Sequence, residues 1–218
     1  MSFKYSCFIS YRHSQKAAAE VLIDNLYKLL AGEISLWLNE EVFLDRDRLR
    51  GGDFYNEALS RALCQSVCMI VLYTPIYFDT DFTYCAREYL AMEALEKQRL
   101  SLLGNLSVQE HGLIIPVVCR GRDLLPDIIK RRRNFFDFEK YYVTGPRLPS
   151  RGPCVTDIQA IARYIRARYE ELSSLPDDPT SNCTGFRLPS DTEVRTWIES
   201  IRAVRALRMP FPGRLPFL

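Results

Sequence analysis

The sequence has little of what metal sites and the common nucleotide-dependent enzymes require. Only two of its 218 residues are histidines, and none of its seven cysteines belongs to a Cys-x-x-Cys pair. A structural zinc site is therefore not expected. The sequence also contains no Gly-x-Gly-x-x-Gly, no Walker phosphate loop, no His-Glu-x-x-His and no Gly-x-Ser-x-Gly. These absences count against ordinary dehydrogenases, nucleoside triphosphatases, zinc proteases and serine hydrolases.

Charge of one sign and long apolar runs are missing as well. The 29 basic and 27 acidic residues leave a net charge of +2, so no global field attracts nucleic acid or an anionic membrane. The basic run at residues 130–133 stands without interleaved aromatic residues, which is typical of a solvated face. No apolar run approaches the ~18 residues of a membrane-spanning helix, and residues 1–4 carry no signal-peptide pattern. We expect a protein that binds neither nucleic acid nor membrane.

The cysteines indicate a reducing compartment. Their number is odd, and several lie within apolar stretches, where a thiol packs as a small hydrophobic group. We therefore expect free thiols and a cytoplasmic location. The cysteines within apolar stretches are Cys7, Cys64, Cys68 and Cys119.

Short apolar runs alternate with helical patterns as far as residue 172. Nearly continuous apolar strands of this kind are typical of a parallel sheet covered by helices on both faces. Gly32 is expected to end the first helix, and Pro116 indicates a strand near an edge of the sheet. The predicted strands are 5–11, 34–38, 67–73, 113–118 and 135–138, and the predicted helices are 16–30, 54–63, 82–99 and 156–172.

The C-terminal part has a different composition. Residues 173–189 hold three prolines and are predicted to form a linker, and Ser190 with Glu193 has the pattern of a capping box. The helix that follows carries an apolar stripe that it cannot bury by itself, so it must dock elsewhere. We expect an α/β domain over 1–172, a linker over 173–189, and a helix with a Pro- and Phe-rich tail over 190–218. The stripe consists of Val194, Ile198, Ile201 and Val204, with Trp197 beside it.

Polar residues follow the predicted strands at one edge of the sheet. Open parallel sheets bind ligands beyond the carboxyl ends of their strands. Arg12 and His13 follow the first strand, and an arginine fork suits a diphosphate or a carboxylate. Glu88 falls in the first turns of a helix at the same edge, where a carboxylate can stabilise positive charge on a sugar carbon. A solvated glutamate near a helix N-terminus is the alternative that the residues alone leave open.

In combination these segments resemble the Toll/interleukin-1 receptor (TIR) domain family over residues 5–172. Residues 8–12, Phe-Ile-Ser-Tyr-Arg, resemble box 1 of the family, and residues 43–52 resemble its BB loop. Residues 67–75 resemble the strand that ends at a serine- or threonine-proline step. Residues 84–88, Tyr-Cys-Ala-Arg-Glu, look like the aromatic-x-x-x-Glu segment of enzymatic members. The resemblance implies a flavodoxin-like open sheet of five parallel strands in the order 2-1-3-4-5, with helices on both faces.

The resemblance to enzymatic TIR domains also implies cleavage of the nicotinamide–ribose bond of NAD⁺. NAD⁺ is then the substrate, no cofactor or metal is required, and Glu88 matches the catalytic glutamate. The products are nicotinamide and ADP-ribose, or a cyclic or conjugated ADP-ribose signal. Self-association between TIR domains is expected, because a neighbouring BB loop often completes the site in this family. The resemblance gives as candidate substrate-binding residues Ser10, Arg12, His13, Asp45, Arg50 and Tyr84.

Two other functions stay open beside an NAD⁺-cleaving enzyme. One is a non-catalytic adaptor that acts through TIR–TIR assembly, but Arg50 stands where adaptors of the family commonly have proline. The other is a nucleotide-sensing module whose C-terminal helix, residues 190–207, docks a partner. An effector protein is the candidate partner for residues 190–218. A compact TIR domain without receptor, death or leucine-rich segments favours a prokaryotic enzyme of an antiviral defence system.

Overall fold

The computed structural model of the chain describes residues 3–13, 17–44, 55–103, 112–142 and 147–206. Over these ranges the strands form a five-stranded sheet, all parallel, in the order β2-β1-β3-β4-β5. This confirms the fold and the strand order expected from the sequence. The strands are β1 (Tyr5–Tyr11), β2 (Glu41–Leu44), β3 (Ser66–Tyr73), β4 (Ile114–Val118) and β5 (Phe136–Asp137).

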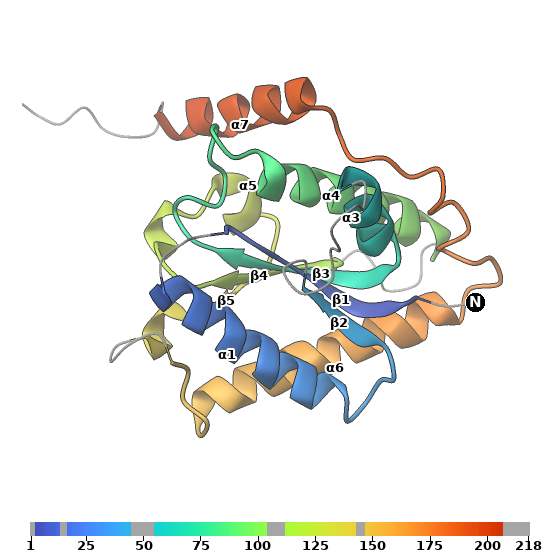
Figure 1. Cartoon of the computed structure of the whole chain (residues 1–218), viewed down its shortest axis with the longest axis horizontal. Helices are drawn as coiled ribbons and strands as arrows, with labels where there is room; N and C mark the ends of the chain where they lie inside the picture. Colours follow the sequence, from blue (N-terminus) through green and yellow to red (C-terminus); the bar gives the residue numbers. More distant parts are fainter. Residues whose placement is uncertain (1–2, 14–16, 45–54, 104–111, 143–146, 207–218) are drawn as a thin grey trace, which may run out of the picture.

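Helices cover both faces of the sheet. They are α1 (Ala17–Ile34), α3 (Tyr55–Cys64), α4 (Tyr84–Leu102), α5 (Asp127–Lys130), α6 (Pro153–Ser173) and α7 (Asp191–Ala206), with 3₁₀ helices η2 (Arg122–Leu124) and η3 (Glu139–Tyr141). Figure 1 shows α1 and α6 on one face and α3, α4 and α5 on the other, with α7 outside α4. None of the helices in these ranges has the length and apolarity to cross a membrane.

The core lies on the two faces of the central strands. Every residue of β1 and β3 is buried, which explains why both read as continuous apolar runs in the sequence. Apolar residues one turn apart on α1 and α6 cover one face, and residues of α4 cover the other. The buried residues of these helices include Leu26, Leu30, Ile161, Ile165, Tyr89 and Met92.

The second strand is not where the apolar pattern predicted it. The expected strand 34–38 is wrong, because α1 runs through Gly32 to Ile34 and β2 begins only at Glu41. Glycine inside a helix costs about 1 kcal/mol, but the extra turn buries Ile34 to 1% exposure. Leu36 and Trp37 are 75% and 44% exposed and after Ile34 only Leu38 packs against the core, so this segment lacks the continuous burial of a central strand.

Pro116 lies near an edge of the sheet, as expected, in the strand next to the edge strand. β4 lies between β3 and β5, and Pro116 is aligned with Val71 of β3. β5 is short, however, and it pairs only with Val117 and Val118. Proline lacks a backbone N–H, so it is tolerated at a position that β5 does not reach.

One member of the basic run is part of the interior. Arg133 forms a two-pronged ion pair with Glu96, at 2.6 and 2.8 Å, and its Nε donates to the hydroxyl of Tyr89. Glu96 also accepts a hydrogen bond from the backbone N–H of Ile114, so the pair ties α4 to the start of β4. The prediction of a solvated face holds for residues 130–132, which are exposed, and is wrong for Arg133.

The expectation of free thiols fails for one pair of cysteines. Cys64, at the end of α3, forms a disulfide with Cys183, 119 residues further along the chain. The turns of the linker bring Cys183 to α3, a proximity that apolar patterning does not encode. The other cysteines are buried thiols, and burial raises the pKa of Cys7 and of Cys119 to about 12.

This distribution predicts the outcome of a thiol titration. Protein purified without reductant and denatured is expected to show five thiols, rising to seven after reduction. The native protein is expected to react slowly, because the thiols are buried and mostly protonated. Seven thiols in the denatured, unreduced protein would contradict the pairing of Cys64 with Cys183.

Candidate active site

A buried carboxylate lies at the carboxyl edge of the central strands. Glu88 is one turn into α4 and is only 4% exposed. The hydroxyl of Ser10, near the end of β1, donates a hydrogen bond to its Oε2 at 2.5 Å. Ser10 itself is 1% exposed. The structure therefore brings together two residues that stand 78 positions apart in the sequence, and both were predicted to belong to the site.

Tyr77 extends this contact into a chain of three residues. Its hydroxyl lies 2.5 Å from Oγ of Ser10, and its ring is fully buried against Phe78. Because Ser10 has a single hydroxyl hydrogen and gives it to Glu88, Tyr77 donates to Ser10. Burial raises the pKa of Tyr77 well above its usual value, so the phenol stays protonated as a donor. We call Tyr77, Ser10 and Glu88 the carboxylate chain.

Sequence reasoning did not find Tyr77. The available signal was its place just after β3, at the strand edge where ligands bind. A turn in which the N–H of Tyr77 donates to the carbonyl of Thr74 directs its ring inward. In the sequence alone, nothing separates such an aromatic residue from one that merely fills the core.

Arg12 and His13 follow β1 beside this chain. The guanidinium of Arg12 lies 3.6 Å from the centre of the Phe82 ring, and its Nη1 donates to the carbonyl of His13. The imidazole of His13 is stacked on Tyr11, with ring centres 4.5 Å apart. Arg12 is half-buried and His13 is exposed. A cation held on an aromatic face keeps its remaining N–H donors for a ligand.

Two exposed aromatic rings flank the start of α4. Phe82 is 49% exposed and Tyr84 is 46% exposed. Tyr84 was predicted to line the pocket, and the guanidinium of Arg87 lies 5.4 Å from its ring. Exposed aromatic rings next to a buried carboxylate offer faces on which a planar base can stack.

Two predicted site residues, Asp45 and Arg50, lie outside the described residues.

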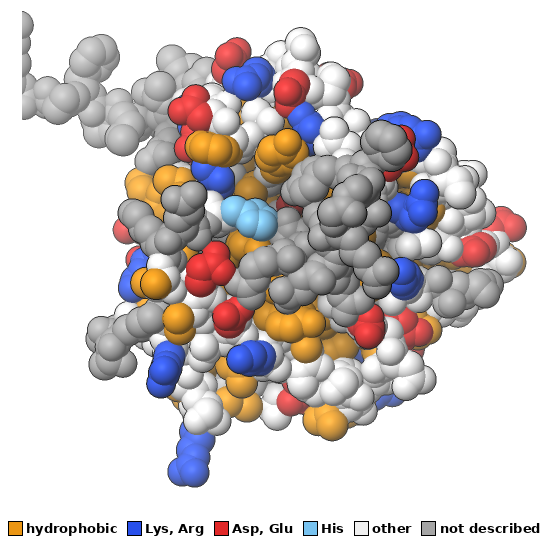
Figure 2. Space-filling view, in the orientation of Figure 1, with side chains coloured by type: hydrophobic (Ala, Val, Ile, Leu, Met, Phe, Trp, Pro, Cys, Tyr) orange, Lys and Arg blue, Asp and Glu red, His pale blue; other side chains and the backbone are white. Residues whose placement is uncertain are grey.

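The ranges that the structure describes contain no group of three or more His, Cys, Asp or Glu side chains placed to hold a metal ion. Figure 2 shows basic and acidic side chains interspersed over the face that it displays, in keeping with the small net charge.

The fold and the site agree with the family to which the sequence is similar. A flavodoxin-like α/β domain carries a buried carboxylate at the ligand-binding edge of its sheet. The family model for the TIR domain matches residues 7–145, which is well over half of the chain. The chain therefore belongs to the TIR-domain family.

The similarity to a solved structure is low in sequence identity. Among solved structures, the chain is similar to the TIR domains in the structure of the activated Roq1 resistosome directly recognizing the pathogen effector XopQ. The sequence identity is 16%, the TM-score is 0.37, and the match covers 90% of this chain and 98% of that one. No curated protein matches the chain.

The carboxylate chain predicts how stability depends on alkaline pH. Because the pKa of Tyr77 is raised by burial, its stabilising contribution is complete below pH ~10, the usual tyrosine value, and is lost as pH rises further. Tyr77→Phe is expected to lower the free energy of unfolding by about 1 kcal/mol at neutral pH and to make its decline above pH ~10 shallower.

Urea denaturation followed by circular dichroism, at several values between neutral and pH ~11, measures both effects. Tyr27→Phe, on α1 at the opposite face of the sheet, is the matched control for the loss of a phenol. Equal alkaline slopes for wild type and Tyr77→Phe would contradict the prediction.

Proposed function

We propose that this TIR domain cleaves the nicotinamide–ribose bond of NAD⁺ and that Glu88 is its catalytic residue. The observation that carries the proposal is the burial of Glu88 at the ligand edge, with a hydroxyl donating to its carboxylate. A buried carboxylate costs free energy unless it is hydrogen-bonded, and such costs are typical of functional sites.

The chemistry requires a carboxylate and little else. Nicotinamide carries its positive charge before the bond breaks, so it leaves as a neutral molecule and needs no general acid. The electron pair of the C–N bond goes to the nicotinamide nitrogen, and the ribose carbon becomes oxocarbenium-like. The Glu88 carboxylate offsets that charge in the transition state. Its burial strengthens the effect, because few water molecules screen it.

The ribose cation then meets a nucleophile. Attack by water gives ADP-ribose and releases a proton, whereas attack by the adenine or a ribose hydroxyl of the same molecule gives a cyclic product. Exclusion of water favours the second outcome. Chromatography of the products of NAD⁺ distinguishes the two.

Arg12 is the proposed contact for the diphosphate of NAD⁺. Its guanidinium is held on Phe82 just beyond the end of β1, and an arginine fork matches phosphate oxygens. Tyr84 offers an exposed ring for the nicotinamide or the ribose. His13, Asp45 and Arg50 stay predictions from the resemblance, as do TIR self-association and a role in antiviral defence.

The roles proposed for Ser10 and Tyr77 differ from direct substrate binding. Both are buried, and Ser10 already donates to Glu88. We assign them the task of orienting the Glu88 carboxylate toward the ribose, because a carboxylate with a fixed rotamer is better placed to meet a developing charge.

Glu88→Gln is expected to reduce nicotinamide release by a factor on the order of 100 to 1,000, because it removes the negative charge and keeps the shape. The measurement is nicotinamide released from NAD⁺ by the self-associated protein. Glu93→Gln is the matched control, since Glu93 lies on the same helix and its side chain is 31% exposed.

Equal rates for wild type and Glu88→Gln would refute the catalytic assignment. A wild-type protein that self-associates but releases no nicotinamide would refute the enzymatic proposal and favour the adaptor. Light scattering on the same samples reports the self-association.

Ser10→Ala is expected to lower kcat about tenfold with a smaller effect on KM, because it removes a hydrogen bond that orients the Glu88 carboxylate. The loss of a donor also disfavours the ionised carboxylate, so the acid limb of the pH–rate profile should move to higher pH. Tyr77→Phe should move the same limb less, and Tyr27→Phe should leave it in place. An unchanged profile for Ser10→Ala would show that the hydroxyl is only structural.

A further inference from the structure

The C-terminal helix α7 docks on its own domain. The capping box predicted from the sequence is present, with Ser190 and Glu193 exchanging hydrogen bonds at its start. Val194 and Ile198 are fully buried, and Trp197 lies against the rings of Phe78 and Tyr89 at 5.2 and 5.6 Å. Figure 1 shows α7 lying along the outer side of α4. Val194, Trp197, Ile198 and Ile201 of the apolar stripe therefore pack against the TIR domain.

Two arginines of α7 hold the loop that precedes α4. Arg195 donates to the backbone carbonyl of Thr80 at 3.0 Å. Arg202 donates to the carbonyl of Phe78 at 3.1 Å and to the hydroxyl of Thr80 at 3.3 Å. These bonds fix the backbone between Tyr77, which begins the carboxylate chain, and Phe82, which supports Arg12.

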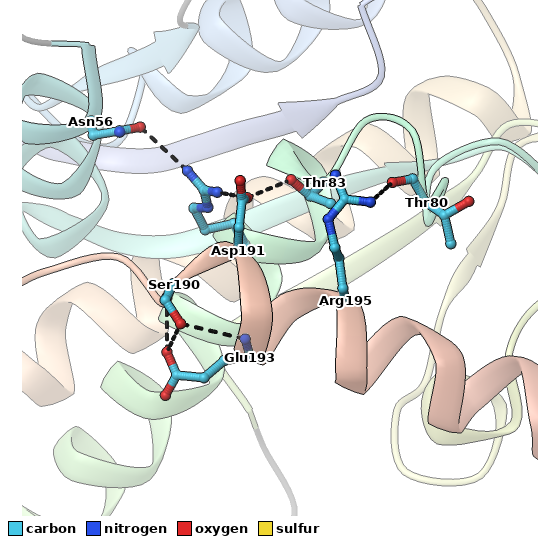
Figure 3. A network of polar contacts seen from close by, with 8 residues as sticks. Asn56, Thr80, Thr83, Ser190, Asp191, Glu193 and Arg195 are labelled. Carbon is cyan, nitrogen blue, oxygen red and sulfur yellow. Dashed lines mark hydrogen bonds and ion pairs between the residues drawn. The ribbon is translucent and has the colours of Figure 1, made fainter.

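Asp191, the first residue of α7, holds the start of α4. It accepts hydrogen bonds from the hydroxyl of Thr83, at 3.0 Å, and from the guanidinium of Arg87. Figure 3 shows Asp191 pointing toward Thr83, with Arg195 reaching Thr80 from the same helix. Thr83 is the N-cap residue of α4, and Arg87 directly precedes Glu88.

The contacts of α7 therefore converge on residues 78–87. This segment connects Tyr77, which begins the carboxylate chain, to Glu88, which ends it. The residues of α7 that make these hydrogen bonds lie along one face of the helix. They are Asp191, Arg195 and Arg202. The opposite side of α7 is polar and exposed, as expected for a face in solvent. The exposed residues include Thr192, Thr196, Glu199 and Ser200.

We infer that α7 is a positioning element of the candidate NAD⁺ site, with Asp191, Arg195 and Arg202 as positioning residues. It holds residues 78–83 so that Phe82 stays beneath Arg12. The effect on NAD⁺ binding rests on the proposed function. The ordering of residues 78–83 by α7 is independent of the proposed function. A positioning role for α7 also means that residues 190–202 belong to the catalytic unit, so the face of α7 that carries Val194 and Ile198 is not a recruitment surface.

The test uses the full chain with the double variant Arg195→Ala/Arg202→Ala. Hydrogen exchange of the amides of residues 78–83 is expected to accelerate on the order of tenfold, because three hydrogen bonds to this segment are lost. KM for NAD⁺ is expected to rise about tenfold with kcat changed less than about threefold, since the carboxylate chain is untouched. Glu199→Ala, on the exposed side of the same helix, is the matched control.

A second variant tests the other anchor. Asp191→Asn keeps the size of the side chain and removes the charge that faces Arg87, and it should accelerate exchange in the first turn of α4. Fluorescence of Trp197, recorded in a Trp37→Phe background that leaves a single tryptophan, reports whether α7 stays docked. A melting curve shows that each variant is folded.

The outcomes separate the two proposals. Faster exchange with a raised KM supports the inference. Unchanged exchange at residues 78–83 overturns it, whether or not the protein cleaves NAD⁺. Faster exchange with wild-type kinetics also overturns it, since α7 would then only pack against the domain. Faster exchange with higher activity overturns it as well, since α7 would then restrain the activity of the site. If the wild type releases no nicotinamide, the enzymatic proposal fails, and faster exchange still supports the ordering role of α7.

Discussion

The parallel pairing of β1 with β3 is the constraint on which the rest of this structure depends. Both strands are buried at every residue, and a slip of one residue would turn each side chain to the other face. The register aligns Ser10 with Val71 and Tyr11 with Leu72. It thereby fixes the end of β1 beside the turn that follows β3, where Tyr77 meets Ser10.

The burial of Glu88 follows from that arrangement. A charged side chain at 4% exposure is tolerated only with polar partners, and the end of β1 supplies one through Ser10. The same helix start carries Tyr84, which is exposed, so a single turn of α4 presents a buried charge and an open aromatic surface. This combination suits a ligand with a planar base next to a carbon that becomes cationic.

The helix α7 completes the surroundings of that turn by two kinds of contact. Apolar burial of Val194 and Ile198 stabilises the docking, because the free energy of burial is roughly proportional to the apolar area removed from water. The arginine and aspartate contacts are partly exposed and contribute less to stability. Their directional hydrogen bonds instead decide which backbone atoms of residues 78–83 are held.

Features that depend on neighbouring residues could be predicted from the amino-acid sequence. Continuous apolar runs predicted β1, β3 and β4, the capping box predicted the start of α7, and the pattern around Glu88 predicted its place near the ligand edge. Long-range contacts decided the rest: the position of β2 beyond Trp37, the bond between Cys64 and Cys183, and the docking of α7. Tertiary structure alone could decide these, because each depends on which surfaces the folded sheet leaves uncovered, and local propensity does not encode that.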